Sequence, residues 1–465
     1  MYVFEKKNLN KKVGILGLGL SGVSAFRYFK RIGLKIVGWD DSAEVRKNNT
    51  QLEIQIVDLN KKHNLQNIDV LLVSPGIPKN HTIIKMASKF GKIITNDIDI
   101  FWNDESLKKN NFIGISGSNG KSTVSSIVHH IMISSKIPTK IAGNIGIPVL
   151  GLTPFKQKGT YVLELSSYQL DLIKQFRPNT SVLINISPDH LERHGSLEDY
   201  ILAKEKLFYN QRKEDTAIIN IDNDHCNFLY KKLRNKKKSP KIVTISLSHK
   251  KKNSVYFNKD ILIDYTGEKK VEIGNIEKLT TLKGEHNKEN IACAVAACLC
   301  NGISHREIKK NLPSFQNLSN RIEEIDAIKN ISFVNDSKAT NLVSTIAALK
   351  CFKKIIWIAG GQDKNEDLRQ LLSVQKNIMA GFFIGTSGEK FCEFFKKYFY
   401  VNNSLLLKKA VQDSMSYALK LKSPVVILFS PGCASFDQFK NFQIRGEAFK
   451  SEVNAIKQKY LGKTK

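Results

Sequence analysis

The stretch Phe112-Ile113-Gly114-Ile115-Ser116-Gly117-Ser118-Asn119-Gly120-Lys121-Ser122-Thr123 decides the fold. Its first four residues form a short apolar run that is typical of a buried strand, and a glycine-rich turn and a helix-length segment from Ser122 to Ser135 follow. A strand that leads through such a turn into a helix is the repeating unit of parallel sheets covered by helices. The chain is therefore predicted to be α/β.

Short apolar runs of this kind recur along the chain and fall into three sets. The first is Val13–Leu16, Ile36–Trp39 and Val70–Val73; the second is Phe112–Ile115, Tyr161–Leu165 and Ser181–Ile186, closed by a helix at about Lys288–Cys300 before Gly302; the third is Ile331–Val334, Ile355–Ala359, Gly381–Ile384 and Val425–Phe429. Such runs are typical of parallel strands buried on both faces.

The length of 465 residues agrees with about three domains. We expect a Rossmann-like domain at 1–100, a central P-loop-type ATPase domain with a mostly parallel sheet at 101–318, and a second Rossmann-like domain at 319–465. Ligands of such sheets gather at the carboxyl ends of the strands, so functional residues are sought there.

The net charge of +29 raises nucleic acid or an acidic membrane surface as a partner, but the distribution of the charge argues against both. Lysines are scattered over the chain, with dense clusters at Lys231–Lys241 and Lys250–Lys252, and no aromatic residues interleave within the clusters as a base-stacking platform requires. We interpret the clusters as solvated loops or hairpins. We expect a monomer with small-molecule partners, and with neither nucleic acid nor membrane as a partner.

Neither a membrane span nor a secretory signal is expected. The longest apolar runs, such as Val425–Phe429, are far shorter than the ~20 residues that a span needs, and Met1–Lys12 is mixed and charged. The seven cysteines are odd in number and form no CxxC pair. We therefore expect buried thiols in a cytoplasmic protein.

The turn Gly117–Thr123 predicts a nucleotide triphosphate site. Its backbone amides can surround phosphates, Lys121 can neutralise the terminal phosphate, and the Ser122 hydroxyl can bind Mg²⁺. The spacing departs from the strict G-x-x-x-x-G-K-[ST] pattern, because the first glycine position falls on Ile115.

Magnesium at this turn would need oxygen ligands from neighbouring strand ends. Glu164 lies in one such strand, and Asp189 and His190 follow another. Asp189 is the more usual ligand type. From composition alone, His190 is explained equally well by a site residue and by a capped turn.

A second glycine turn, Gly17-Leu18-Gly19-Leu20-Ser21-Gly22, follows the first strand, and Asp40 ends the next one. Such a turn lets backbone amides approach a pyrophosphate, and an acid like Asp40 can bind a ribose. Taken alone, the pattern indicates an NAD-dependent dehydrogenase. UDP satisfies it equally, and a tight turn without a ligand is the other alternative.

Several stretches resemble the Mur ligase family in order and spacing. They are Gly117–Thr123, Gly143–Gly146, Glu164–Gln169, Asn185–His194, Gly284–Asn287 with Asn290, Asn335–Asn341, Gly360–Lys364 and Ser430–Phe439. The likeness spans almost the whole chain, and the last three stretches resemble the members that add D-glutamate. It implies ATP-dependent ligation of D-glutamate to UDP-N-acetylmuramoyl-L-alanine through an acyl phosphate and a tetrahedral intermediate, in cytoplasmic peptidoglycan precursor synthesis.

The resemblance also implies the residues that bind ATP and Mg²⁺. The nucleotide residues are Gly117, Ser118, Asn119, Gly120, Lys121, Ser122, Thr123, Asn287, Asn290, Arg321 and Asp336; the ligands of two Mg²⁺ ions are Ser122, Glu164, His190 and Lys204; the catalytic residues are Lys121, His190, Lys204 and Lys338. Lys204 is expected to be carbamylated, because the CO₂ adduct is an anionic oxygen ligand whereas an ammonium repels Mg²⁺. Lys206 is the alternative site of the adduct.

The substrate residues follow from the same resemblance. They are Leu20, Ser21, Asp40, Asp41, Ser42, Ser74 and Gly76 for UDP, Asn144 and Gln169 for the muramoyl and peptide part, and Thr340, Lys364, Ser435, Phe436 and Phe442 for D-glutamate. Phe436 stands where the family pattern leads us to expect leucine, which bears on the shape of the D-glutamate pocket.

Three rival functions stay open from the sequence. A dehydrogenase leaves Gly117–Thr123 without a role, and a basic nucleic-acid NTPase explains none of the stretches after residue 330. A sibling Mur-type ligase or a folylpolyglutamate synthase is the nearest rival. The first glycine turn counts against the folate enzyme, and Ser430–Phe442 counts against the siblings.

Overall fold

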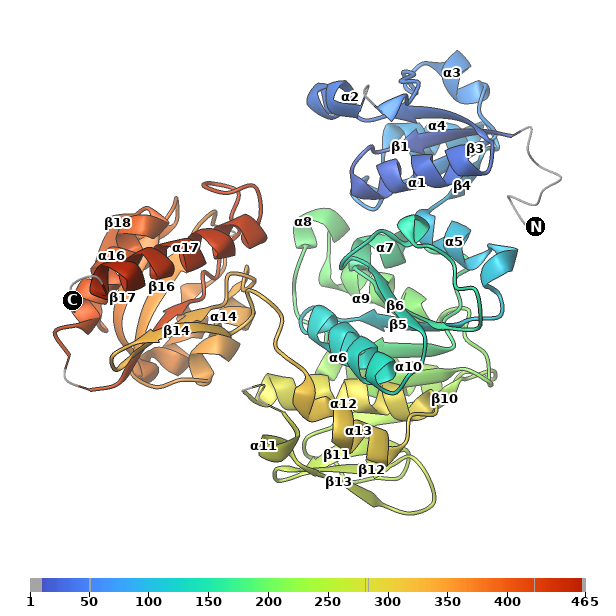
Figure 1. The fold of residues 1–465 in the computed structure, drawn as a ribbon. Helices are drawn as coiled ribbons and strands as arrows, with labels where there is room; N and C mark the ends of the chain where they lie inside the picture. Colours follow the sequence, from blue (N-terminus) through green and yellow to red (C-terminus); the bar gives the residue numbers. More distant parts are fainter. Residues whose placement is uncertain are drawn as a thin grey trace. The chain divides into compact units, whose positions relative to one another are not determined.

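The computed structural model describes residues 11–49, 52–280, 282, 284–363, 365–421 and 423–461. They form three separate sheets of four, nine and six strands (Figure 1). The chain divides into two compact units, Met1–Thr280 with Lys288–Phe315, and Thr281–Asn287 with Gln316–Lys465. The first unit contains two of the sheets, so the domain boundary near residue 100 remains a prediction.

The first sheet is parallel, with the strand order β2-β1-β3-β4. Side chains of α1 pack on one face of it, and side chains of α3 and α4 pack on the other. Its elements are β1 (Lys12–Leu16), α1 (Leu20–Arg31), β2 (Lys35–Trp39), α2 (Ala43–Asn49), α3 (Lys62–Gln66), β3 (Val70–Val73), α4 (Thr82–Lys89) and β4 (Ile93–Thr95), followed by α5 (Asp97–Trp102).

The second sheet has the strand order β13-β12-β11-β10-β9-β8-β5-β7-β6. Strands β5 to β11 are parallel, and β12 and β13 continue the sheet antiparallel. Its elements are β5 (Asn111–Ser116), α6 (Lys121–Ser134), β6 (Thr139–Gly143), β7 (Thr160–Glu164), α7 (Ser167–Leu172), β8 (Thr180–Leu183), α8 (Leu191–His194), α9 (Leu197–Glu205), β9 (Thr216–Asn220), α10 (Asp224–Arg234), β10 (Lys241–Ser246), β11 (Ser254–Asn258), β12 (Ile261–Tyr265), β13 (Val271–Asn275), α11 (Ile276–Leu279), α12 (Glu285–Cys300) and α13 (His305–Asn311).

Strand β5 lies between β7 and β8, which come later in the chain. The connection from β5 leads outward to β6, and the chain then returns to the other side of β5 through β8. Parallel sheets place ligands at such a reversal of strand order, at the carboxyl ends of the strands. The turn Gly117–Thr123 therefore faces the segments that follow β7 and β8.

The lysine clusters differ from the predicted loops or hairpins. Lys231 to Arg234 form the last turn of α10, and Lys241 begins β10, so the first cluster spans a helix end, a connection and a strand start. Only Lys250–Lys252 lie in a connection between strands. Helical periodicity in α10 was hidden because only three of its residues, Cys226, Leu229 and Leu233, are buried.

The second unit has one sheet, in the order β14-β15-β19-β16-β17-β18, parallel except for β14. Its two faces are covered by separate apolar clusters. Its elements are β14 (Glu323–Ile328), β15 (Ile331–Asn335), α14 (Leu342–Lys350), β16 (Ile355–Gly360), β17 (Ile378–Ile384), α15 (Gly388–Phe395), β18 (Tyr400–Leu405), α16 (Leu407–Ala418), β19 (Val425–Phe429) and α17 (Phe442–Leu461). The predicted α/β class with mostly parallel sheets is confirmed. Within the described residues no helix is long and apolar enough to cross a membrane.

Candidate active site

One cavity of about 700 Å³ in the first unit joins the two glycine turns. Ten of the predicted site residues line it: Leu20, Ser21, Asp40, Ser74 and Gly76 from the first sheet, and Lys121, Asn144, Gln169, His190 and Lys204 from the second. Residues predicted for UDP and residues predicted for the phosphate end of ATP thus face a common space.

The turn Gly117–Thr123 is held by its own lysine. Lys121 Nζ donates to the carbonyl oxygens of Gly117 (2.9 Å) and Ser118 (2.8 Å). Gly120 has a φ of +82°, and a Cβ there would lie 2.1 Å from Asn290 Oδ1, so this position requires glycine. Asn290, predicted for the nucleotide, therefore lies against the turn.

Lys204 lies beneath the same turn and is fully buried. Its Nζ donates to Gly117 O at 2.8 Å, so two lysines share one carbonyl oxygen. Burial, and then the charge of Lys121, lowers the pKa of the Lys204 amine well below its usual range. The alternative, Lys206, donates instead to the carbonyl and the carboxylate of Asp171 and does not line the cavity.

Glu164, at the end of β7, is buried, and only one of its two carboxylate oxygens accepts a hydrogen bond within the described residues. Its Oε1 accepts a hydrogen bond from Asn144 Nδ2 at 2.7 Å. Its Oε2 is buried and has no hydrogen-bond partner within the described part of the chain. A buried carboxylate oxygen without a donor is costly unless a cation meets it, so this oxygen fits a metal ligand.

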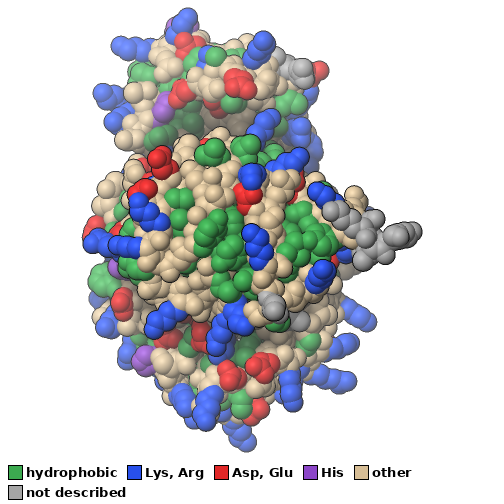
Figure 2. All heavy atoms as spheres, turned by 90° about the vertical axis from the view of Figure 1, so that its left-hand side faces the viewer, with side chains coloured by type: hydrophobic (Ala, Val, Ile, Leu, Met, Phe, Trp, Pro, Cys, Tyr) green, Lys and Arg blue, Asp and Glu red, His purple; other side chains and the backbone are tan. Residues whose placement is uncertain are grey.

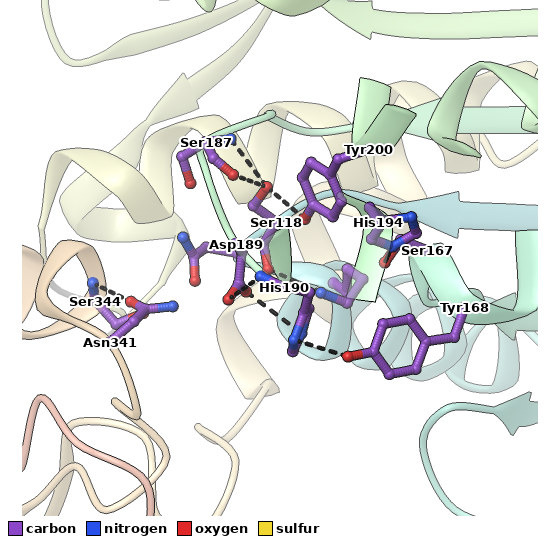
Figure 3. Close-up of polar contacts among 12 residues, drawn as sticks. Ser118, Ser167, Tyr168, Ser187, Asp189, His190, His194, Tyr200, Asn341 and Ser344 are labelled. Atoms are coloured by element: carbon purple, nitrogen blue, oxygen red, sulfur yellow. Dashed lines mark hydrogen bonds and ion pairs between the residues drawn. The ribbon is translucent and has the colours of Figure 1, made fainter. Parts of the chain in front are cut away.

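His190 stands at the amino end of α8 with a φ of +55°. Its Nδ1 lies 3.1 Å from the Tyr168 hydroxyl, and its Nε2 lies 3.5 Å from Asp189 Oδ2 (Figure 3). His190 is thus held from both sides at the cavity wall. Across the described residues, no three His, Cys, Asp or Glu side chains form a ready metal cluster, so any metal here would share its ligands with other groups.

The first glycine turn is built from backbone and one acid. Asp40 Oδ2 accepts from Leu18 N at 2.8 Å and Oδ1 accepts from Ser42 N at 3.0 Å. A Cβ on Gly22 would lie 1.9 Å from Gly17 O, so α1 begins in close contact with the turn. Asp40 therefore shapes the turn as well as facing the cavity.

Two predicted UDP residues lie outside the cavity lining. Asp41 accepts from Trp39 Nε1 at 3.2 Å and pairs with His81 Nε2 at 2.9 Å. Ser42 Oγ accepts from Val45 N at the start of α2. Both side chains serve local structure in this conformation.

The second unit brings the predicted D-glutamate residues to neighbouring loops. Thr340 follows β15 and Ser435 follows β19, which are adjacent strands, and Gly432 N donates to Ala339 O at 3.0 Å. Phe436 is 69% exposed, so its ring is available to a ligand. Lys364 lies outside the described residues.

Two charged residues of this unit are held close to its loops. Asp336 accepts from Ser430 Oγ at 2.8 Å and from Ile322 N at 3.2 Å, and burial raises its pKa to about 7 against these bonds and the charge of Arg321. Lys338 Nζ lies 3.8 Å from the centre of the Phe442 ring, a cation–π contact.

Sequence reasoning missed three residues that hold these sites. Tyr168 contacts His190, and the Tyr200 hydroxyl lies 2.8 Å from Ser118 Oγ (Figure 3). Arg445, buried in α17, donates to Ser337 Oγ and O and to the carbonyls of Cys433 and Ala434. Tyr168 lies within the family-like stretch Glu164–Gln169 and Tyr200 lies four residues before Lys204, so both could have been found from the sequence, whereas no local pattern marks a buried arginine.

Comparison with known proteins agrees with this arrangement. The model of the Mur ligase middle domain matches residues 115–298, and that of the Mur ligase MurD-like N-terminal domain matches residues 11–96. The UDP-N-acetylmuramoylalanine–D-glutamate ligase of Caulobacter vibrioides is 36% identical over 455 residues, covering 96% of each chain. The ligase of the same name from Rickettsia prowazekii is 36% identical over 444 residues, covering 94% of this chain and 97% of its own.

Solved structures share the fold at low identity. The UDP-N-acetylmuramate-alanine ligase MurC of Thermotoga maritima has a TM-score of 0.58 at 16% identity, covering 96% of this chain and 100% of its own. MurF of Acinetobacter baumannii has a TM-score of 0.58 at 15% identity, covering 88% and 98%. Two relatives above 30% identity, aligned over nearly the whole of both chains, are named UDP-N-acetylmuramoylalanine–D-glutamate ligases, and the turn Gly117–Thr123 lies within the region that matches the Mur ligase middle domain. The chain therefore belongs to the Mur ligase family.

Proposed function

We propose that this protein joins the amine of D-glutamate to the terminal carboxylate of UDP-N-acetylmuramoyl-L-alanine, with conversion of ATP to ADP and phosphate. The observation that carries the proposal is the single cavity that both glycine turns line. A UDP-linked substrate held at the first turn can extend its carboxylate towards a phosphate held at the second. The names of the full-length relatives support the choice of substrates.

The reaction requires a carboxylate to react first with a triphosphate and then with an amine, and a free carboxylate reacts poorly with both. It repels the triphosphate, and its oxygen leaves poorly when an amine attacks. Transfer of the terminal phosphoryl group of ATP to the carboxylate gives an acyl phosphate and ADP. Attack by the amine then gives a tetrahedral intermediate, which expels phosphate, while the amine loses a proton.

Lys121 supplies positive charge to the first step. In our proposal the Lys121 ammonium, now on the carbonyls of Gly117 and Ser118, turns to the terminal phosphate when the nucleotide fills the loop. The amides of Gly117–Thr123 bind the remaining phosphate oxygens. Asn290 and Asn287 are the proposed adenine contacts, and Arg321 and Asp336 the proposed ribose and phosphate contacts.

Members of this family use ATP and Mg²⁺, and the residues present fit the metal. Glu164 Oε2 is a buried oxygen without a donor, and Ser122 and His190 complete the proposed ligand set. Mg²⁺ would neutralise phosphate charge and orient the phosphoryl group. Asn144 fixes the Glu164 carboxylate by holding its other oxygen.

Lys204 is the proposed site of carbamylation. Burial lowers the pKa of the Lys204 amine, which favours loss of its proton, and an uncharged amine can attack CO₂. The new N–C bond gives a carbamate, and one proton leaves. The carbamate anion would replace a repulsive ammonium with an oxygen ligand for the second metal site, next to the cation of Lys121.

The second unit is proposed to bind D-glutamate through Thr340, Ser435, Phe436, Phe442 and Lys364, with Lys338 at the reacting groups. Hydroxyls and ammonium groups suit its two carboxylates. We further propose that the enzyme acts as a monomer in the cytoplasm, where ATP and nucleotide-linked substrates are available.

Phosphate release tests the whole proposal. The protein is supplied with ATP, Mg²⁺ and UDP-N-acetylmuramoyl-L-alanine, and with D-glutamate, L-glutamate, L-alanine or diaminopimelate in separate assays. Only D-glutamate is expected to support turnover. Equal turnover with L-glutamate would remove the specific assignment.

Lys204→Ala tests the carbamate, with Lys206→Ala as the matched control two residues away. Lys204→Ala is expected to lose nearly all activity and to regain part of it with formate or acetate, because a small carboxylate can occupy the emptied space as a metal ligand. Lys206→Ala is expected to retain activity. Loss in Lys206→Ala alone would move the adduct to that residue.

A further inference from the structure

The outer surface of α10 carries a dense positive charge that the proposed reaction does not use. Residues 225–259 contain eleven lysines and arginines and no aspartate or glutamate. Six of these cations, Lys231, Lys232, Arg234 and Lys236–Lys238, are exposed along the last turn of α10 and the connection to β10. We call these six, with Lys250–Lys252 and the aromatic residues described next, the α10 surface.

Aromatic rings lie among these cations, although the sequence does not place them inside the lysine runs. Phe228 is 62% exposed and lies on the face of α10 opposite the buried Cys226, Leu229 and Leu233. Lys231 and Lys232 share that face, three and four residues further on. Phe228 is therefore an exposed apolar ring flanked by positive charge.

Two further rings bring the separate lysine runs together. Lys251 Nζ lies 4.7 Å from the centre of the Tyr230 ring, which brings the Lys250–Lys252 segment against α10. Lys236 Nζ lies 5.4 Å from the centre of the Tyr209 ring, which is 50% exposed. The two lysine clusters of the sequence thus form one continuous surface.

Little negative charge offsets this surface. Lys232 pairs with Glu205 and Lys252 pairs with the exposed Glu268. In the described part of the chain, Lys231, Lys237 and Lys238 make no ion pair. Like charges held this close repel one another, and an anionic partner would relieve that repulsion.

We propose that the α10 surface binds the anionic face of a phospholipid bilayer. Lysines are compact point charges that follow charge density on a surface, and a single arginine, Arg234, offers little of the forked recognition of nucleic-acid phosphates. Lysines lie over the ring of Tyr209, which is half exposed, and over the ring of Tyr230, so Phe228 is the most exposed ring of this surface. One open ring suits insertion at the headgroup level, whereas single-stranded nucleic acid needs several stacking rings.

The six exposed cations of α10 and its connection to β10 lie away from the candidate active site, whereas Lys250–Lys252 follow the carboxyl end of β10. Residues 235–240 connect α10 to the first residue of β10 and so lie at the amino edge of the parallel strands. The turn Gly117–Thr123 lies at the carboxyl edge. The inference is independent of the proposed reaction, and it differs from our expectation from sequence that no membrane surface is bound. Lysines and arginines are also scattered over the face in Figure 2, so the experiment must separate this surface from charge in general.

The test is binding of the full-length protein to vesicles of phosphatidylcholine with and without about one third phosphatidylglycerol, measured by co-sedimentation at moderate salt. A variant with Lys231→Gln, Lys237→Gln and Lys238→Gln removes three unpaired charges. The matched control carries Lys62→Gln, Lys85→Gln and Lys89→Gln, which removes three exposed lysines from α3 and α4. Both variants are expected to keep phosphate-release activity.

The wild-type protein is expected to bind the anionic vesicles and not the neutral ones. The α10 variant should bind roughly ten- to a hundredfold more weakly, because each lysine near an anionic surface adds about fivefold before salt screening. The control should stay within about twofold. Phe228→Ser should weaken binding while leaving the charge unchanged.

Three results would overturn the proposal. One is absence of binding to anionic vesicles by the wild-type protein. Another is an equal loss in the α10 variant and the control, which would assign binding to net charge alone. The third is binding of a single-stranded oligonucleotide that the α10 variant loses, together with unchanged vesicle binding, which would assign the surface to nucleic acid.

Discussion

The two glycine turns of the first unit have the same layout of strand, turn and helix, yet they are stabilised in different ways. In the turn at Gly17–Gly22, backbone packs on backbone, and Asp40 accepts the Leu18 amide. In the turn at Gly117–Thr123, the side-chain nitrogens of Lys121 and Lys204 donate to the carbonyls. The first turn offers a ligand a fixed backbone surface. In the second turn, the Lys121 ammonium can exchange its carbonyl partners for a phosphate.

The ionisable group buried behind each turn also differs between the two turns. Asp97 lies behind the first turn, and burial raises its pKa to about 6 against the Ile98 amide and the Ser21 hydroxyl. Lys204 lies behind the second, and burial lowers its pKa. A fixed turn suits recognition of an unchanging nucleotide sugar, whereas movable cations suit a phosphate whose charge is redistributed during reaction.

The largest difference between the turns should appear on removal of Lys121. Lys121→Met is expected to lower the rate of phosphate release roughly 10²- to 10³-fold, because a positive charge at the transferred phosphate is lost. Steady-state kinetics with saturating UDP-linked substrate measure the effect. A fall of less than about threefold would mean that the second turn, like the first, works through its backbone.

A methyl group added to the first turn should cost less, and it should act on fold and substrate affinity together. Gly22→Ala places Cβ 1.9 Å from Gly17 O, so we expect about 1–3 kcal/mol of destabilisation and a raised KM for the UDP-linked substrate. Gly19→Ala is the matched control, since a Cβ there meets nothing within 4 Å. Equal stability of both variants in urea would show that the first turn is not rigid.

The pH dependence of stability should sharpen the comparison further. Because its pKa is raised, Asp97 stabilises the fold fully below about pH 4, where even the unfolded chain is protonated, and loses that contribution as pH rises through about 6. The difference amounts to at most about 3 kcal/mol. Asp97→Asn should remove this slope from urea unfolding measured between pH 4 and 7.

Asp336, in the second unit, titrates in the same direction with a pKa of about 7. The result therefore rests on the difference between wild type and Asp97→Asn at each pH. An unchanged slope in the variant would mean that Asp97 stays ionised behind the turn.

The smallest effect is expected from Ser21→Ala, which removes a cavity-lining hydroxyl from the first turn. One neutral hydrogen bond is worth about 0.5–1.5 kcal/mol, so KM for the UDP-linked substrate should rise roughly two- to tenfold while kcat stays the same. A lowered kcat with unchanged KM would place Ser21 in the chemistry and weaken the distinction between the turns.

Sequence patterns predicted those parts of the fold in which burial is uniform. All ten predicted strands exist within a few residues of their expected bounds, because strands buried on both faces read as apolar runs. Strands β4, β6, β9 to β13, β14 and β18 were missed, and the lysines around β9 to β13 obscure the pattern there. Strand β12 also buries one face more than the other, as its alternating burial pattern shows.

The candidate site likewise contains residues that sequence patterns located and residues whose surroundings only the structure shows. Motif order placed Lys121, Glu164 and His190 at neighbouring strand ends, and the structure brings them to one edge of the second sheet. The choice between Lys204 and Lys206 needed the end of α9, where the chain passes into a 3-10 turn and the two side chains diverge. Asp41 and Ser42 were assigned by position alone, and their local partners could not be read from spacing.

The contacts of Arg445 constrain the order in which the second unit can fold during synthesis. Its guanidinium is the link between Ser337 and the loop at Cys433–Ala434, yet it follows Ser337 by 108 residues. During synthesis, the loop after β15 can form its contacts with Arg445 only after most of the second unit has left the ribosome. A chain interrupted before α17 would contain every amino-acid-binding residue proposed for these loops except Phe442 and would still lack an assembled pocket.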